Sequence, residues 1–292
     1  MAKFGPKDIK KLREITDAGM MDCKEALKAT DGDMEKAIEW LRKKGLGAAA
    51  KKADKVAAEG VIAIKSDGKK AIMLEVNSQT DFVAKNEKFQ NFVNEVLEHV
   101  FKNDFNSIED ILNSNINNQP FNEYLALQIA TIGENLVVRR YAKVVTEGSL
   151  GTYVHANSKV GVIVAANKEG LEDALKNIAM HAAAMSPKYL NEEAVPSDVV
   201  EKEKEIAREQ LLKEGKPENI LEKILPGKIK RFMQDNTLEN QKFVMDDKVS
   251  VKEYLQSNNK EAKLTNYVRF ELGEGIEKVE EDFAAEVAKQ MA

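Results

Sequence analysis

The residues that could perform covalent chemistry are few and scattered in this chain. Its three histidines, His99, His155 and His181, are far apart and lack the spacing of metal ligands. The single cysteine, Cys23, has no sequence neighbour that would activate a thiolate, and one cysteine cannot form an internal disulfide. We therefore expect these residues to be structural, with no metal site and no catalytic centre.

Motifs that cradle phosphate or activate a serine are also missing. The chain has no GxxxxGK[ST] loop, no GxGxxG after a strand and no GxSxG turn. Its 49 acidic residues are spread over charged helical segments and suggest no acid–base pair. Basic residues interleaved with aromatic ones, as in base-stacking surfaces, are absent as well. The sequence thus predicts a protein that is not an enzyme and needs no cofactor.

One short segment, residues 77–87 (NSQTDFVAKNE), stands out as a candidate contact surface. It lies where an expected strand ends and an expected helix begins, and Thr80 or Asp81 can cap that helix. Phe82 then falls in the first helical turn. In one interpretation Phe82 folds back into the core and the two polar residues only cap. In the other, an acid and an aromatic side chain stand together at a tip and are inserted into a partner's site.

Composition indicates a soluble, cytoplasmic protein of two or three domains. The 292 residues are 43% hydrophobic and 32% charged, with a net charge of −5. This mildly acidic balance disfavours direct contact with nucleic acid, which usually requires a basic face. The N-terminus lacks the apolar region of a signal peptide, and no apolar run is long enough to span a membrane.

The elements that must position the segment 77–87 can be read from hydrophobic periodicity. The first 45 residues show three short amphipathic helices, separated by breaks at Ala18-Gly19 and at residues 31–33. They look like a ubiquitin-associated-type bundle, a kind of module that usually binds proteins. We predict this domain at residues 1–45 and a partly helical linker at 46–58.

The region after the linker repeats one plan, in which a β-hairpin, a helix and a returning strand follow each other. The strands are expected, in order, at residues 61–65, 71–76, 136–145, 152–155, 161–165 and 264–272. We predict an α+β core with two subdomains, each a small antiparallel sheet backed by helices. Subdomain N takes residues 59–146, and subdomain C takes residues 147–197 and 236–273.

A large insertion interrupts the second half of this core. Two charged amphipathic helices, expected at 199–213 and 218–233, are separated by a Gly and a Pro and predict an antiparallel coiled-coil hairpin at 198–235. Pro226 is expected to kink or split the second helix. Its apolar faces are expected to contain Val199, Val200, Ile206, Leu211, Ile220, Leu221, Ile224 and Leu225. Residues 274–292 are predicted to form a C-terminal amphipathic helix.

Short motifs are spread over nearly the whole chain, and the first two are at residues 17–45 and at residues 77–89 (NSQTDFVAKNEKF). They resemble the opening motif and the signature, respectively, of the bacterial elongation factor Ts family. Further similar motifs follow in family order at residues 132–140, 159–166, 177–187 and 215–223. The family architecture has a ubiquitin-associated-type domain, a two-part core, a coiled-coil hairpin and a C-terminal module, which agrees with the plan above.

The resemblance implies a guanine-nucleotide exchange factor that binds elongation factor Tu, GDP-bound and nucleotide-free, and promotes GDP release during translation elongation. It implies that Thr80, Asp81, Phe82 and Val83 disturb the magnesium and phosphate site of that partner. It also implies other partner contacts, at Lys24, Ile132, Gly133, His155, Val244 and Met245. The hairpin is expected to serve a homodimer or a second contact, which the sequence does not decide.

The chain departs from the family pattern at three places. Lys242 stands where the family usually has proline, which bears on the loop that carries Val244 and Met245. Asp54-Lys55 replaces a common Gly-Arg, and the Asn-rich residues 103–122 look longer than usual and are expected to form a surface excursion. Two rival functions stay open: a protein-binding adaptor or chaperone that works through residues 1–45, and an RNA-binding module, which the net charge disfavours.

Overall fold

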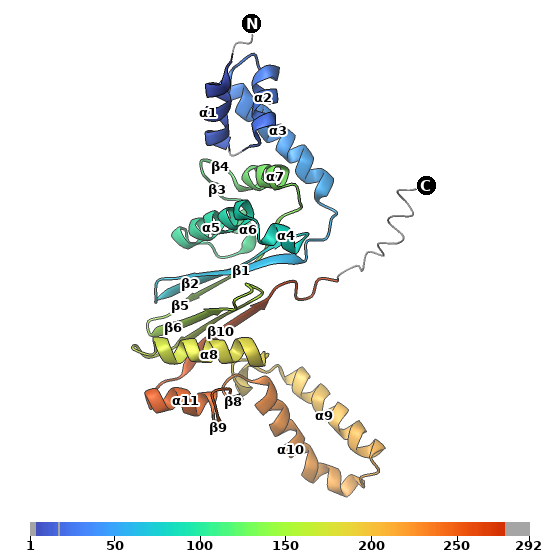
Figure 1. The fold of residues 1–292 in the computed structure, drawn as a ribbon. Helices are drawn as coiled ribbons and strands as arrows, with labels where there is room; N and C mark the ends of the chain where they lie inside the picture. The colour runs from blue at the N-terminus through green and yellow to red at the C-terminus, as the bar shows by residue number, and fades with distance from the viewer. Residues whose placement is uncertain (1–3, 17, 278–292) are drawn as a thin grey trace. The chain divides into compact units, whose positions relative to one another are not determined.

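The computed structural model describes residues 4–16 and 18–277, which form α-helices and small antiparallel sheets (Figure 1). The expected α+β class is thereby confirmed. The chain divides into two compact units. Unit 1 combines the residues up to 63 with residues 74–141 and those from 271, and unit 2 combines residues 64–73 with 142–270. The finer subdomain boundaries given above stay predictions.

Three helices open unit 1: α1 (Pro6–Thr16), α2 (Met20–Ala29) and α3 (Met34–Lys52). Asp33 caps α3 by accepting a hydrogen bond from the Lys36 amide at 3.1 Å. The helices bury Leu12, Cys23, Leu27 and Leu41 against one another. Burial raises the pKa of the Cys23 thiol, so this cysteine packs as a small apolar residue.

Helix α3 continues past Gly45 to Lys52, into the segment 46–58, because an alanine-rich sequence favours helix. The part of α3 around Gly45 packs on α7 (Phe121–Ile132). The two backbones approach closely at Gly45, where an added Cβ would lie 3.4 Å from backbone atoms of Ala126. The three-helix bundle and α7 are thus one packed layer of unit 1.

The first sheet has the strand order β1-β2-β5, with β1 at Glu59–Ser66, β2 at Lys70–Ser78 and β5 at Val137–Val145. After β2 come the one-turn helix α4 (Asp81–Ala84) and the longer α5 (Glu87–Lys102). The apolar face of α5 is buried, and its members are Phe89, Phe92, Val93, Val96, Leu97 and Val100. This face is the hydrophobic stripe that the sequence indicates.

Residues 103–122, expected to form a surface excursion, are mostly exposed, but they also contain regular structure that the sequence did not predict. They form α6 (Ile108–Leu112) and a two-stranded ribbon of β3 (Asn115–Ile116) and β4 (Gln119–Pro120). Ile111, Ile116 and Phe121 are buried. Two of the asparagines, Asn117 and Asn118, have positive φ angles of 51° and 60° in the ribbon's turn, a conformation that asparagine tolerates better than most residues.

Unit 2 contains the second sheet, with the order β10-β7-β6: β6 at Ser149–Val154, β7 at Val160–Ala166 and β10 at Leu264–Glu271. Helix α8 (Glu172–Met185) packs closely on β6 and β7. At Gly151 an added Cβ would lie 2.3 Å from a backbone atom of Leu175, so only glycine fits there. As in the first sheet, the second strand of the hairpin is central and the returning strand lies beside it.

Unit 2 also carries a short ribbon, β8 (Lys242–Phe243) with β9 (Asp246–Ser250), followed by α11 (Val251–Asn258). A 3-10 turn (Glu192–Ala194) leads to the helical hairpin of α9 (Ser197–Lys213) and α10 (Glu218–Asn236), which Figure 1 shows in pale and dark orange. Phe243 anchors the ribbon by stacking on Tyr254, with ring centroids 4.0 Å apart.

The hairpin buries a smaller seam than the sequence predicts. Ala207, Leu211 and Leu221 are buried, whereas Ile206 and Ile220, which were expected in the seam, are exposed. Which side chains are buried between two helices depends on how each helix is rotated toward the other, and here the small Ala207 is buried instead of its neighbour Ile206. Helix α10 is continuous through Pro226, so of the two expected effects the split does not occur, and the kink stays a prediction.

The predicted C-terminal helix lies outside the described residues, apart from its first positions up to Glu277. Among the helices that the structure describes, none is long and apolar enough to cross a membrane.

Candidate protein-binding site

The junction after β2 places Thr80, Asp81, Phe82 and Val83 at a tip. Asn77 and Ser78 are buried at the end of the strand, which fixes where the tip begins. Thr80 has extended backbone angles, and its Oγ1 accepts a hydrogen bond from the Val83 amide at 3.3 Å. Of the two caps that the sequence allows, Thr80 is therefore the N-cap of α4, and α4 begins at Asp81. We call residues 79–83 the tip segment.

Phe82 points away from the core, with 81% of its surface exposed. The interpretation of Phe82 as a core residue is wrong. In the short helix α4 the buried position falls to Ala84, and Phe89 in α5 fills the core beneath. Phe82 is the only phenylalanine in the described part of the chain that is classed as exposed. An aromatic ring in water without an apolar neighbour to cover it is a feature of contact surfaces.

Asp81 lies beside Phe82 and forms an ion pair with Lys85, with 2.8 Å between the carboxylate oxygen and Nζ. The side chains of Lys85 and Asp81 are 77% and 47% exposed, so the pair contributes little to stability. The Asp81 carboxylate can thus exchange this partner for another cation without a large cost.

A carboxylate from a distant part of unit 1 holds the tip segment. Glu134 Oε2 accepts hydrogen bonds from the Gln79 and Thr80 amides, each at 3.0 Å, and Oε1 accepts one from the Thr80 hydroxyl at 2.7 Å. Sequence reasoning missed Glu134 because its partners lie 54 and 55 positions earlier. The motif at 132–140 contains it but gives no sign of this contact.

Ile132 and Gly133 immediately precede Glu134 and end α7. Gly133 has a φ of 94° and terminates the helix, with its amide donating to the Ile129 carbonyl at 2.9 Å. Its own carbonyl accepts a hydrogen bond from Lys52 Nζ, at the end of α3. Ile132 is half-buried and Gly133 exposed. The structure therefore brings these two predicted contact residues next to the tip segment through Glu134.

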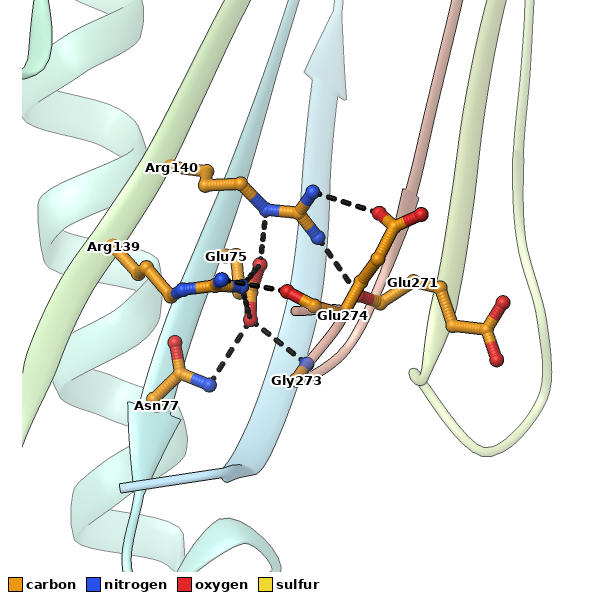
Figure 2. Close-up of polar contacts among 7 residues, drawn as sticks. All are labelled: Glu75, Asn77, Arg139, Arg140, Glu271, Gly273 and Glu274. Atoms are coloured by element: carbon orange, nitrogen blue, oxygen red, sulfur yellow. Dashed lines mark hydrogen bonds and ion pairs between the residues drawn. The ribbon is translucent and has the colours of Figure 1, made fainter. Parts of the chain in front are cut away.

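Further along β2, the carboxylate of Glu75 is fully buried and accepts several hydrogen bonds (Figure 2). Its donors are the Gly273 amide at 2.9 Å, the Asn77 side chain at 3.0 Å, Arg139 Nη1 at 3.0 Å and Arg140 Nε. Burial by itself raises the pKa of the Glu75 carboxyl. The Gly273 amide, Asn77 and Arg140 outweigh it and hold the pKa below its ordinary value.

The same arginines hold the chain after β10. Arg139 Nη2 donates to the Glu274 carbonyl at 2.6 Å, and Arg140 Nη2 donates to the Glu271 carbonyl at 2.7 Å. Arg140 Nη1 also pairs with the Glu274 carboxylate at 2.9 Å. In the sequence, Arg139-Arg140-Tyr141 is too short to indicate nucleic-acid binding. In the structure Arg139 and Arg140 have a structural role, because they connect residues 271–274 to Glu75 of β2.

In unit 2 the structure brings His155, Val244 and Met245 together around a cavity of about 440 Å³. Val244 and Met245 are 52% and 54% exposed, in the turn between β8 and β9. His155 is exposed at the end of β6, with Nδ1 2.9 Å from the Asn157 side-chain oxygen. With neighbouring side chains, among them Tyr153, Val160 and Met180, these three residues line an open apolar hollow with a polar edge, which suits a protein partner's side chain.

A buried histidine supports that hollow from below. The Val244 amide donates to His181 Nδ1 at 3.1 Å, and His181 Nε2 lies 2.9 Å from the Gln241 side-chain oxygen. Because Nδ1 accepts, Nε2 carries the proton and the ring is neutral. Burial lowers the pKa of His181, and the Gln241 contact opposes this only in part. Lys242 is exposed in β8, so its departure from proline leaves the anchors Phe243 and His181 in place.

Lys24, the remaining predicted contact residue, is exposed on α2. Its helix also presents Met20 and Met21, which are exposed apolar side chains, and Ile15 of α1 is exposed as well. No group of three or more His, Cys, Asp or Glu within the described residues could hold a metal ion.

Comparison with known proteins gives a consistent result along the chain. The protein family described as "Elongation factor TS" matches residues 79–274. The chain is 55% identical to elongation factor Ts of a Nitratiruptor species, over 97% of both chains. It is 49% identical to that of Nautilia profundicola over the whole of both chains, and 45% identical to that of Halothermothrix orenii over 98% of this chain and 97% of the relative.

Proposed function

This chain belongs to the elongation factor Ts family, and from that premise we propose that it is a guanine-nucleotide exchange factor that binds elongation factor Tu and speeds GDP release during translation elongation. The observation that carries the mechanism is the exposure of Phe82 beside Asp81 on a capped tip. Neither residue performs covalent chemistry, and the reaction promoted is a dissociation on another protein.

Exchange requires the factor to bind nucleotide-free elongation factor Tu more tightly than the GDP-bound form. Linkage then demands that the factor weaken GDP by the same ratio. GTPases hold the nucleotide partly through Mg²⁺, which keeps few protein ligands and relies on phosphate oxygens and water. A ring inserted next to that site displaces the surrounding chain and so removes a disproportionate share of the grip on GDP.

Phe82 is suited to insertion because its burial in a partner recovers apolar surface that now faces water. Full burial of a phenylalanine side chain is worth roughly 1.5–3 kcal/mol. Asp81 adds a carboxylate that competes for cations and hydrogen-bond donors at the partner's site. We assign Thr80 and Val83 the role of holding this pair in the α4 turn, since the Val83 amide caps onto Thr80.

The remaining contacts supply affinity away from the nucleotide. Lys24 on α2 and Ile132-Gly133 at the end of α7 belong to unit 1, as the tip does. His155, Val244 and Met245 around the cavity of unit 2 form a second contact. Separate contacts allow the factor to stay bound while the tip opens the nucleotide site. We propose no role for nucleic acid or membrane.

The test is release of a fluorescent GDP analogue from elongation factor Tu. The wild-type chain should accelerate release strongly at micromolar concentration. Phe82→Ala should slow the stimulated release about 10- to 100-fold, because roughly 1.5–3 kcal/mol is lost at about 1.4 kcal/mol per tenfold. Val145→Ala is the matched control, since Val145 is also an exposed apolar residue but lies on β5, away from the tip.

Two outcomes would contradict different parts of the proposal. If the wild-type chain leaves the release rate unchanged, the exchange function is wrong. If the double variant of Phe82→Ala and Asp81→Ala releases GDP as fast as wild type, the function stands and the tip mechanism is wrong.

A further inference from the structure

Glu134 has no role in the mechanism given above, yet it makes three of the hydrogen bonds that hold the tip segment. We infer that Glu134 is a positioning residue for exchange: its carboxylate fastens the tip to the end of α7, so that Phe82 and Ile132-Gly133 meet the partner as one rigid surface. This inference rests on the proposed function, but part of its test does not.

The directions of these hydrogen bonds follow from the donors available. The Val83 amide can only donate, so Thr80 Oγ1 is the acceptor in that hydrogen bond. The hydroxyl hydrogen of Thr80 is therefore left to be donated to another acceptor. An ionised carboxylate can only accept, so that hydrogen goes to Glu134 Oε1 at 2.7 Å. A directed series therefore runs from the Val83 amide through the Thr80 hydroxyl to Glu134, and it sets the α4 cap that carries Asp81 and Phe82.

The second oxygen of Glu134 fixes the backbone before the helix. Oε2 receives two successive amides, of Gln79 and Thr80, each at 3.0 Å. Two adjacent N–H groups aimed at one oxygen determine the orientation of the peptide between them, and bonds to a charged acceptor are the stronger kind. The Ser78 hydroxyl donates to the Thr80 carbonyl at 3.0 Å, so the turn is held from both sides.

The base of this attachment is itself rigid. Glu134 follows Gly133, whose left-handed conformation ends α7 and whose carbonyl is held by Lys52. The next residue, Asn135, is buried and donates to the Lys55 carbonyl at 2.8 Å. Within the described chain every hydrogen bond that the Glu134 side chain accepts comes from Gln79 or Thr80. Its removal should thus free the tip and leave the rest of unit 1 unchanged.

Replacement by alanine and by glutamine should give graded effects. Alanine removes all three acceptors. Glutamine keeps one oxygen for the two amides, but its NH2 group faces a Thr80 hydroxyl that needs an acceptor. We expect Glu134→Ala to lower the maximal rate of stimulated GDP release about 10- to 100-fold, since a displacement of about 1 Å can cost that much. Glu134→Gln should fall between alanine and wild type.

A positioning role differs from a structural one in what else changes. The factor concentration that gives half-maximal release should change less than about threefold, because the contacts of α2 and unit 2 are kept. In a chain that already carries Phe82→Ala and Asp81→Ala, adding Glu134→Ala should have no further effect on the maximal rate. Glu109→Ala, at an exposed glutamate in α6, is the matched control for loss of one negative charge.

Amide hydrogen exchange tests the tether without any partner. In Glu134→Ala the amides of Gln79, Thr80 and Val83 should exchange at least about tenfold faster, while those of α5 and β2 stay as in wild type. Unchanged exchange in the tip would overturn the tether even if GDP release slows. Faster tip exchange with an unchanged maximal release rate, in a wild type that is active, would overturn the positioning role. If the wild-type chain does not accelerate GDP release, the proposed function is wrong. The amide hydrogen exchange of the tip then still decides whether Glu134 holds the tip segment.

Discussion

Replacement of Glu75 by alanine should destabilise unit 1 more than any surface change in this chain. The substitution removes the acceptor for the Gly273 amide, the Asn77 side chain and two guanidinium groups. Removal of one partner of a buried ion pair costs about 3–5 kcal/mol. The two arginines are 26% and 25% exposed, so water takes over part of their solvation, and we expect about 2–3 kcal/mol.

Thermal unfolding at neutral pH measures this loss. For domains of 150–250 residues each kcal/mol lowers the midpoint by about 2–4 °C, so the shift should be about 4–12 °C. The unfolding midpoint of Glu75→Gln should lie between those of Glu75→Ala and wild type, because glutamine keeps an acceptor for the Gly273 amide but loses the charge. Glu274→Gln is the matched control, since Glu274 pairs with the same Arg140 but is 56% exposed, and it should cost at most about 1 kcal/mol.

The pH dependence has a definite sign. The pKa of Glu75 is lower in the folded chain than the ordinary glutamate value of about 4.3, so the folded state stabilises the ionised form. The resulting stability is fully present above the unfolded pKa and is lost as pH falls through the folded one. The difference between wild type and Glu75→Gln should therefore shrink below about pH 4. A Glu75→Ala variant as stable as Glu274→Gln would refute the reasoning.

Three other substitutions test separate elements. The pKa of His181 is lowered in the folded chain, so unfolding takes up a proton below about pH 6.5 and wild type loses stability there. His181→Gln should abolish this pH-dependent loss, which is measured by following the unfolding midpoint as the pH is lowered. Leu221→Ala should cost about 2–5 kcal/mol at a buried hairpin position, and limited proteolysis should then cut α9 or α10 first. Gly151→Ala should destabilise unit 2 by at least about 1–3 kcal/mol, because the added Cβ would overlap the Leu175 backbone. Denaturant unfolding measures this loss of free energy.

Much of the fold could be predicted because local patterns determine it. The stripe on α5, the cap at Thr80 and the paired hairpins all follow from residues within a few positions of one another. For the Asn-rich segment 103–122, composition indicated only solvent exposure, and most of the segment is exposed. It did not reveal that Asn117 and Asn118 form one tight turn while Ile111 and Ile116 enter the core.

The candidate site was predictable only in part, for the same physical reason. Thr80 and Asp81 announce a cap, but the direction of Phe82 depends on how α4 meets α5, which no local pattern encodes. Glu134 and Glu75 act through partners far away in sequence, and a glutamate in a strand or loop looks like an ordinary surface residue. A single sequence therefore identifies the residues that touch a partner more readily than those that hold them in place.

The Glu75 cluster also has a consequence for the order in which this chain can fold during its own synthesis. Arg139 and Arg140 follow Glu75 by 64 and 65 positions, but the Gly273 amide follows it by 198. At about 5–20 residues per second that amide is made roughly 10–40 s after the carboxylate. The ion pair can thus form on a nascent chain in which residues 64–73 are the part of unit 2 already made, and the hydrogen bond from the Gly273 amide, which joins residues far apart in the sequence, can form only later.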